Sequence, residues 1–172
     1  MIVLETPRLI LRHFTIADRE ALVPILGDPE VMRYSLDGVK TKSQMGYFLD
    51  RVIDYQACYG FSLYAVLHKQ THELIGFCGL LPWKHDGKTD VELGYRYSKV
   101  NWGKGYATEA ARAICSYAQE KLKISEIYCL IDPENRKSQR VAQKLGMIYQ
   151  KTTVFQGIEV DVYQLQTKKL FP

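Results

Sequence analysis

The spacing of hydrophobic residues changes along this chain between the period of a helix and the period of a strand. Four segments combine apolar residues at helical spacing with residues that favour helix ends. Between them, runs rich in β-branched and aromatic residues predict strands. The predicted helices cover residues 15–27, 41–60, 105–122 and 135–145, and the predicted strands cover residues 8–12, 61–68, 74–81, 90–97, 124–131, 147–155 and 159–165.

Local signals define the ends of these segments. Thr41 and Gln44 have the spacing of a capping box, Asn135 is placed as an N-cap, and Gly60 follows a helix as a left-handed C-cap. Because strands and helices do not alternate strictly, the pattern predicts an α+β fold with a mixed sheet. A chain of 172 residues with 47% hydrophobic residues fits one domain, taken as residues 1–172.

Cysteine and histidine usage argues against a metal centre or a disulfide scaffold. The cysteines are far apart and form no C-x-x-C pair, so we expect reduced core thiols in a reducing compartment. The histidines show no H-E-x-x-H or other paired spacing, so no metal is expected. These residues are Cys58, Cys78, Cys115, Cys129, His13, His68, His72 and His85.

Charge and hydropathy narrow the expected location and partners. No signal peptide is visible, and the longest apolar stretch, near residues 74–83, is far shorter than the ~20 residues that span a bilayer. We therefore expect a cytoplasmic protein with no membrane partner. The net charge of +4 does not indicate direct nucleic-acid binding. Basic residues gather after position 98, which fits either a solvated face or a docking region for an anionic ligand.

One short segment combines the features of an anion-binding site. After a predicted strand, Gly103-Lys104-Gly105 leads directly into a predicted helix. The first turn of a helix leaves main-chain N–H groups without intrahelical acceptors and carries the positive end of the dipole. Glycines leave these groups accessible, Lys104 adds a positive charge, and Thr108 adds a hydroxyl donor. The segment therefore predicts a diphosphate site on residues 103–108.

Other phosphate-binding motifs fit this segment less well. It lacks the G-x-x-x-x-G-K-[ST] pattern of a Walker A loop, which makes a P-loop nucleotide-binding protein a remote alternative. It also lacks the third small residue of a Rossmann fingerprint, because Thr108 stands in that place. Taken alone, the glycines could simply turn the chain, and Lys104 could be a solvated charge.

The residues around the loop resemble a known family. The stretch Trp102-Gly103-Lys104-Gly105-Tyr106-Ala107 resembles the acetyl-CoA-binding motif [RQ]-x-x-G-x-[GA] of the GNAT superfamily. Trp102 departs from the first position, as is typical of the branch with the ribosomal-protein N-terminal (alanine/serine) acetyltransferases. Residues 4–12, with the sequence LETPRLILR, resemble the first strand of that branch, and residues 132–138 and 144–147 resemble its fifth strand and fourth helix.

The resemblance implies a fold and a set of cofactor contacts. The GNAT acyl-CoA N-acyltransferase fold has a mixed, mostly antiparallel sheet of about seven strands, flanked by about four helices and splayed between strands 4 and 5. Pantetheine would pair with the backbone of the strand before the loop, and Asn135 matches the position that binds the pantetheine arm. The expected acetyl-CoA contacts are Tyr95, Arg96, Tyr97, Trp102, Gly103, Lys104, Gly105, Tyr106, Ala107, Thr108, Asn135 and Ser138.

Two residues are candidates for proton transfer. By the resemblance, Ser138 would lie beside the sulfur and protonate the leaving thiolate, because Ala142 stands where many relatives have a tyrosine. The alternative for Ser138 is an exposed helix hydroxyl. Glu92 is the candidate base that takes the proton from the amine through a water. The alternative for Glu92 is a structural carboxylate paired with Arg96 or another neighbour.

The activity implied by the resemblance is N-acetylation of a primary amine, either a protein N-terminus or a small molecule. The acetyl group would move from acetyl-CoA by direct attack in a ternary complex, without an acyl-enzyme. The alternative is a non-catalytic acetyl-CoA-binding regulatory module. Residues 28–42, 83–88 and 155–161 are expected to frame the acceptor site, and the resemblance allows a monomer or a homodimer.

Overall fold

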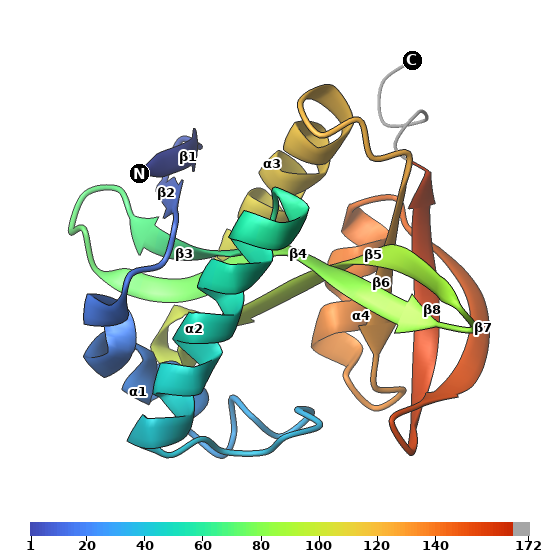
Figure 1. Ribbon diagram of the computed structural model, residues 1–172, viewed down its shortest axis with the longest axis horizontal. Coiled ribbons are helices and arrows are strands. Elements are labelled where there is room, and N and C mark those ends of the chain that lie inside the picture. Colours follow the sequence, from blue (N-terminus) through green and yellow to red (C-terminus); the bar gives the residue numbers. More distant parts are fainter. Residues whose placement is uncertain (167–172) are drawn as a thin grey trace.

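Eight strands form one sheet in the order β1-β2-β3-β4-β5-β6-β8-β7 in the computed structural model, which describes residues 1–166 (Figure 1). All neighbouring strands are antiparallel except β5 and β6, which are parallel. The mixed, mostly antiparallel sheet is thus confirmed; residues 167–172 of the predicted domain lie outside the described residues. The strands are β1 (Ile2–Glu5), β2 (Leu9–Arg12), β3 (Leu63–His68), β4 (Leu74–His85), β5 (Lys88–Tyr97), β6 (Glu126–Ile131), β7 (Ile148–Phe155) and β8 (Ile158–Gln166).

The edge strand β1 is absent from the prediction. It pairs with β2, so that Ile2 lies opposite Arg12 and Glu5 lies opposite Ile10. Only its two central residues are half-buried. A four-residue edge strand is too short to show the alternation of apolar and polar residues by which a strand is recognised.

The helices differ from the prediction mainly before residue 27. The segment predicted as one α-helix contains a 3₁₀ helix, η1 (Ile16–Leu22), followed by a single turn, α1 (Val23–Leu26). Pro24 lies in the first turn of α1, where its missing N–H is not needed, but it cannot continue a helix from the preceding turn. The remaining helices are α2 (Lys42–Tyr59), η2 (Lys99–Asn101), α3 (Tyr106–Glu120) and α4 (Arg136–Lys144).

The capping signals of α2 and α4 act as predicted. The Gln44 amide donates to Thr41 Oγ1 at 3.3 Å, and the Thr41 amide donates to Gln44 Oε1 at 2.8 Å. Gly60 ends α2 in the left-handed region with φ of 75°. Asn135 caps α4, because its Oδ1 accepts from the Ser138 amide at 3.2 Å.

Helices cover both faces of the sheet, and the side chains of each strand alternate between these two faces. Tyr64 and Val66 of β3 point into a core shared with α3 and α4, whereas Leu63 and Ala65 point into a core shared with α1 and α2. Figure 1 shows α2 and α3 on opposite sides of the sheet. The two faces of β5 therefore have different surroundings, and this difference separates the candidate site residues described below.

One residue predicted to lie in the core is on the surface. Cys78, Cys115 and Cys129 are buried free thiols as predicted, but Cys58 is exposed near the end of α2. The buried face of α2 ends with Val52. At 3.6 residues per turn, position 58 has rotated to the other side of the helix.

The sheet splays between β5 and β6. β5 pairs with β4 along its whole length, from Lys88 opposite His85 to Tyr97 opposite Gly76. With β6 it shares only one register position, where Glu92 lies opposite Tyr128. Beyond Glu92, the edge of β5 that faces β6 has no strand partner. The splay falls one strand later than predicted because β1 adds a strand to the count.

Candidate active site

The loop between η2 and α3 presents a row of free main-chain donors. Gly103 and Gly105 have φ of 75° and 82°, in the left-handed region that glycine tolerates. Gly105 occupies the N-cap of α3 and offers no capping side chain. Within the described part of the chain, no acceptor takes a hydrogen bond from the main-chain amides of residues 103–108. The arrangement is the one that binds anions at a helix N-terminus.

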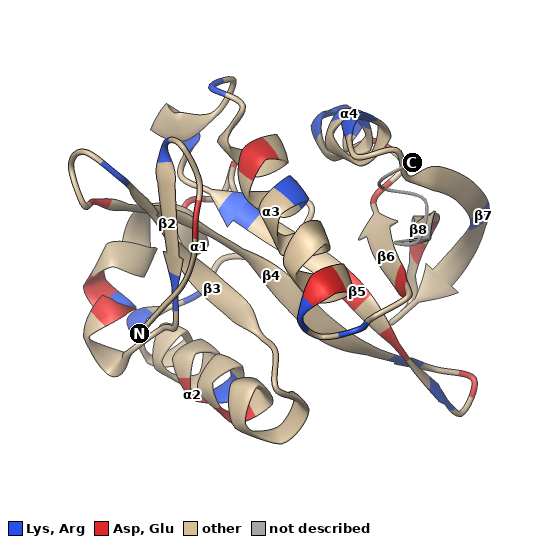
Figure 2. Ribbon diagram, turned by 90° about the horizontal axis from the view of Figure 1, so that it is seen from above, with Lys and Arg blue, Asp and Glu red and all other residues tan. Residues whose placement is uncertain are grey.

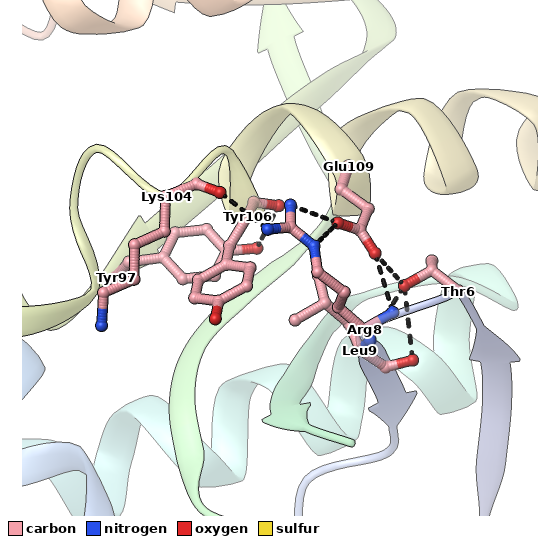
Figure 3. Close-up of polar contacts among 7 residues, drawn as sticks. All are labelled: Thr6, Arg8, Leu9, Tyr97, Lys104, Tyr106 and Glu109. Atoms are coloured by element: carbon pink, nitrogen blue, oxygen red, sulfur yellow. Dashed lines mark hydrogen bonds and ion pairs between the residues drawn. The ribbon is translucent and has the colours of Figure 1, made fainter. Parts of the chain in front are cut away.

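Arg8 holds this loop from the N-terminal side (Figure 3). Its Nη1 donates to the Lys104 carbonyl at 2.9 Å, and its guanidinium lies 4.7 Å from the centre of the Tyr106 ring. The same guanidinium pairs with Glu109 in the first turn of α3, with 2.6 Å between Arg8 Nη2 and Glu109 Oε2. The Thr6 hydroxyl donates to the other carboxylate oxygen at 2.6 Å.

Helix α4 approaches the same loop with positive charge. The Lys137 ammonium lies 4.0 Å from the centre of the Trp102 ring, and Trp102 Nε1 donates to the Tyr97 carbonyl at 2.8 Å. Figure 2 shows basic residues gathered on α4. They include Arg136, Lys137, Arg140 and Lys144. Cations beside free amides favour a ligand with more than one negative charge.

The end of β5 carries three predicted cofactor contacts, whose side chains point to different places. Tyr97 is buried, and its hydroxyl donates to the Tyr106 carbonyl at 3.4 Å. Arg96 points to the other face, where its guanidinium contacts the sulfur of Met32, and burial lowers its pKa. Beyond Glu92, β5 has no strand partner on the side of β6, so alternate main-chain groups of this segment are open to a strand-like ligand.

The side chain of Tyr95 crosses the splay. Its hydroxyl donates to the main-chain carbonyl of Ser138 on α4 at 3.3 Å. Burial raises the pKa of Tyr95 far above its ordinary value, so the phenol stays protonated at neutral pH. Sequence reasoning assigned only a backbone role to Tyr95. The alternation of Leu93, Tyr95 and Tyr97 toward the core with α3 and α4 is the signal that could have located this side chain.

The start of α4 carries the other two candidates, Asn135 as its N-cap and Ser138 in its first turn, where the Ser138 carbonyl meets the Tyr95 hydroxyl. Asn135 uses its Oδ1 as the helix cap, and its Nδ2 has no partner among the described residues. Ser138 is half-buried, and its hydroxyl makes no hydrogen bond to a described residue. Ala142 is fully buried in the core, so this position could not hold a tyrosine without rearrangement of α3 or α4.

Glu92 is half-buried at the point where β5 and β6 separate. Burial raises the pKa of Glu92 from 4.5 to about 7. The alternative of an ion pair with Arg96 or a neighbour is wrong, because no described side chain forms a hydrogen bond or ion pair with this carboxylate. An unpaired carboxylate with a pKa near neutrality can accept a proton and release it again.

The structure brings the predicted residues together in two groups. The loop, Tyr95, Asn135 and Ser138 lie toward the face of α3 and α4, whereas Glu92 and Arg96 point to the face of α1 and α2. The groups meet at the splay. Of the segments expected to frame the acceptor site, the one before α2 reaches the start of α4, since the Tyr34 hydroxyl donates to the Glu134 carbonyl at 3.4 Å.

A splayed mixed sheet with a two-glycine anion loop at the end of its central strand defines a class of acyl-CoA-dependent transferases. The chain belongs to the GNAT acetyltransferase family: the family profile described as "Acetyltransferase (GNAT) domain" matches residues 8–148. It is therefore an acetyltransferase.

No helix in residues 1–166 is both long and apolar enough to cross a membrane.

Relatives extend the similarity over nearly the whole chain. An uncharacterized protein of Bacillus subtilis (strain 168), YkkB, is 37% identical over 162 residues, which are 94% of each chain. The crystal structure of a GNAT-family acetyltransferase from Bacillus anthracis is 26% identical, covers 98% of this chain and 100% of its own, and has a TM-score of 0.83. The ribosomal L7/L12 α-N-protein acetyltransferase RimL, solved with coenzyme A, shares the fold at 17% identity, covers 96% of this chain and 98% of its own, and has a TM-score of 0.81.

Proposed function

We propose that residues 1–172 form one domain that transfers the acetyl group of acetyl-CoA to a primary amine, either a protein N-terminus or a small molecule. The observation that carries the proposal is the row of unpartnered amides at residues 103–108, beside the open edge of β5. A structural neighbour, RimL, is described as an α-N-protein acetyltransferase in complex with coenzyme A, which supports both the cosubstrate and the acceptor class.

Three parts of the site would bind acetyl-CoA. The diphosphate would accept hydrogen bonds from the amides of residues 103–108, with Lys104 and α4 supplying positive charge. The pantetheine amides would pair with the backbone of Tyr95 to Tyr97, on the edge that β6 leaves open. The free Nδ2 of Asn135 would donate to the pantetheine arm. Together these contacts would bring the thioester to the splay.

Glu92 would act as the base. An acceptor amine is mostly protonated at neutral pH, since its pKa lies between about 8 and about 10.4. Glu92, through a water, would take the proton from the ammonium. The nitrogen lone pair would then form a bond to the thioester carbon, the carbon–sulfur bond would break, and the thiolate would leave with its electron pair. The nitrogen would release its second proton to water, which leaves a neutral amide. No covalent enzyme intermediate is needed.

A hydroxyl on the opposite face would protonate the thiolate. Ser138 is the candidate from the sequence, and the Tyr95 phenol lies against the Ser138 main chain. We expect Ser138→Ala to lower kcat about tenfold and Tyr95→Phe to have the smaller effect. The expected loss is modest because thiols have a pKa of about 8.5 and leave without full protonation. Steady-state kinetics on both variants measures the difference; a larger loss in Tyr95→Phe would reassign the acid to Tyr95.

Thiol release from acetyl-CoA tests the proposed function. Peptides that begin with Ser or Ala and a set of small primary amines serve as acceptors, and calorimetry measures acetyl-CoA binding separately. We expect binding by the wild-type protein and acceptor-dependent thiol release. The alternative of a non-catalytic acetyl-CoA-binding module has no support in the comparisons. Binding without turnover on every acceptor would nevertheless favour it, and absence of binding would overturn both.

A further inference from the structure

Among residues 1–166, one side chain holds the carbonyl of the peptide between Lys104 and Gly105. Arg8 Nη1 donates to the Lys104 carbonyl at 2.9 Å. The peptide is trans, so its C=O and N–H point in opposite directions within one plane. By holding the carbonyl oxygen, Arg8 turns the Gly105 N–H to the other side of the loop. That N–H is one of the donors without an acceptor among the described residues.

This peptide needs an external support because a glycine follows it. Rotation of its plane changes ψ of Lys104 and φ of Gly105, and glycine occupies positive and negative φ about equally well. Rotation of the peptide plane would therefore meet little resistance from the chain itself. In the rotated form, the Lys104 carbonyl oxygen would take the place of the Gly105 N–H. Its partial negative charge would then face an incoming phosphate.

Arg8 is itself held by Glu109. The carboxylate accepts from Arg8 Nε at 2.7 Å, from the Arg8 main-chain amide at 3.1 Å and from the Thr6 hydroxyl at 2.6 Å. The Glu109 side chain is 17% exposed and the Arg8 side chain is 45% exposed, so the carboxylate is shielded while the guanidinium stays partly open to solvent. Burial by itself would raise the pKa of Glu109, but hydrogen bonds from Thr6 and Arg8 lower it below its ordinary value, and the pair stays charged.

We propose that Arg8 is a positioning residue for acetyl-CoA, which sets the loop amides for the diphosphate without touching it. The proposal rests on the proposed function. All three guanidinium nitrogens already have partners, because Nε and Nη2 face Glu109 and Nη1 donates to the Lys104 carbonyl. A guanidinium has several nitrogens in a fixed plane, so it can donate to the Glu109 carboxylate and to the Lys104 carbonyl at the same time. A lysine has one terminal nitrogen and cannot make both contacts in this geometry.

Calorimetric titration with acetyl-CoA tests this role without any acceptor. We expect Arg8→Gln to raise Kd about 10- to 100-fold, the range for losing a hydrogen bond to a charged group. Arg8→Lys keeps the charge but not the geometry, and it should resemble Arg8→Gln more than the wild type. At saturating acetyl-CoA, kcat should stay within about threefold of the wild-type value, because the binding step alone is weakened.

Lys69→Gln is the matched control. Lys69 pairs with Glu5 at 2.7 Å and donates to the Thr6 carbonyl at 3.3 Å, so it anchors the same N-terminal segment without contacting Lys104. Its Kd for acetyl-CoA should match that of the wild type. If Arg8→Gln does not fold, Arg8→Lys, which retains the ion pair with Glu109, takes its place in the comparison.

Three results would overturn the proposal. Wild-type affinity in folded Arg8 variants would show that the loop is set without Arg8. An equal loss of affinity in Lys69→Gln would assign the effect to the N-terminal segment as a whole. Absence of acetyl-CoA binding by the wild type would remove the proposed function, and the role of Arg8 with it, whereas the first two results leave the proposed function standing.

Discussion

Replacing Glu92 by glutamine is expected to lower kcat/KM at pH 7 by about 100-fold or more, the range for losing a general base. Glutamine keeps the size of the side chain but cannot take the proton from the acceptor ammonium. The variant should recover activity as the pH rises toward the pKa of the amine itself, about 8 for an α-amine and about 10.4 for a lysine. In the wild type, activity should instead rise with pH through about 7, the pKa of Glu92.

A pH–rate profile of wild type and variant measures this difference. Asp90→Asn is the matched control, because Asp90 lies two residues earlier on the same face of β5 and its carboxylate contacts His85 at 2.7 Å. Asp90→Asn should retain the wild-type profile. If Glu92→Gln kept the profile of the wild type as well, Glu92 would not be the base.

The same substitution should stabilise the fold. Because burial raises the pKa of Glu92 from 4.5 to about 7, the folded protein holds a proton that the unfolded chain releases between these values. Stability is therefore lost as the pH rises from about 4.5 to about 7, and the loss is complete above 7. At pH 8, Glu92→Gln should gain on the order of 1–3 kcal/mol in the free energy of unfolding, and at pH 4 almost nothing.

Thermal unfolding at pH 8 and pH 4 measures that gain. For a domain of this size, each kcal/mol corresponds to about 2–4 °C in Tm. A rise in Tm at pH 8 together with a loss of activity is the expected sign of a charge kept in the site for chemistry at a cost in stability. An equal change in Tm at both pH values would mean that the difference in stability between the wild type and Glu92→Gln comes from packing and not from ionisation of Glu92.

The parts of the fold that were predictable from the sequence are those formed by residues close together in the chain. The loop at residues 103–108 was found because two glycines and a helix start are sequence neighbours. The cap of α2 was found for the same reason, since Thr41 and Gln44 are three positions apart. The 3₁₀ segment η1 was missed because hydrophobic spacing does not distinguish a 3₁₀ helix from a short α-helix.

Contacts between distant segments were beyond sequence reasoning. Arg8 and Glu109 are 101 positions apart, and Tyr95 and Ser138 are 43 apart. Both pairs depend on the strand order, which places β2 near the start of α3 and α4 beside the splay. The alternative pairing of Glu92 with Arg96 is not formed, for a local reason. Four residues along a strand span about 13 Å, which leaves Arg96 near Met32 rather than Glu92.

Gly105→Ala is expected to raise Kd for acetyl-CoA about tenfold or more. At φ of 82° an alanine is strained by about 1–2 kcal/mol, and the free loop can relax by leaving this conformation. Binding of acetyl-CoA must then restore the conformation with φ of 82°, and the free energy needed for this weakens binding by the same amount. The added Cβ would also lie 3.4 Å from Arg8 Nη2, close enough to disturb the side chain that holds the Lys104 carbonyl.

Gly60→Ala separates this effect from a general loss of stability. Gly60 has φ of 75° and ψ of 1°, against 82° and 1° at Gly105, so the backbone strain is nearly the same. An added Cβ at Gly60 meets no atom within 4 Å, and Gly60 caps α2 on the other face of the sheet. Both variants should lose stability in thermal unfolding, Gly105→Ala no more than Gly60→Ala because its free loop can relax, but only Gly105→Ala should lose affinity in calorimetry. Equal affinities in the two variants would mean that the conformation of Gly105 does not govern phosphate binding.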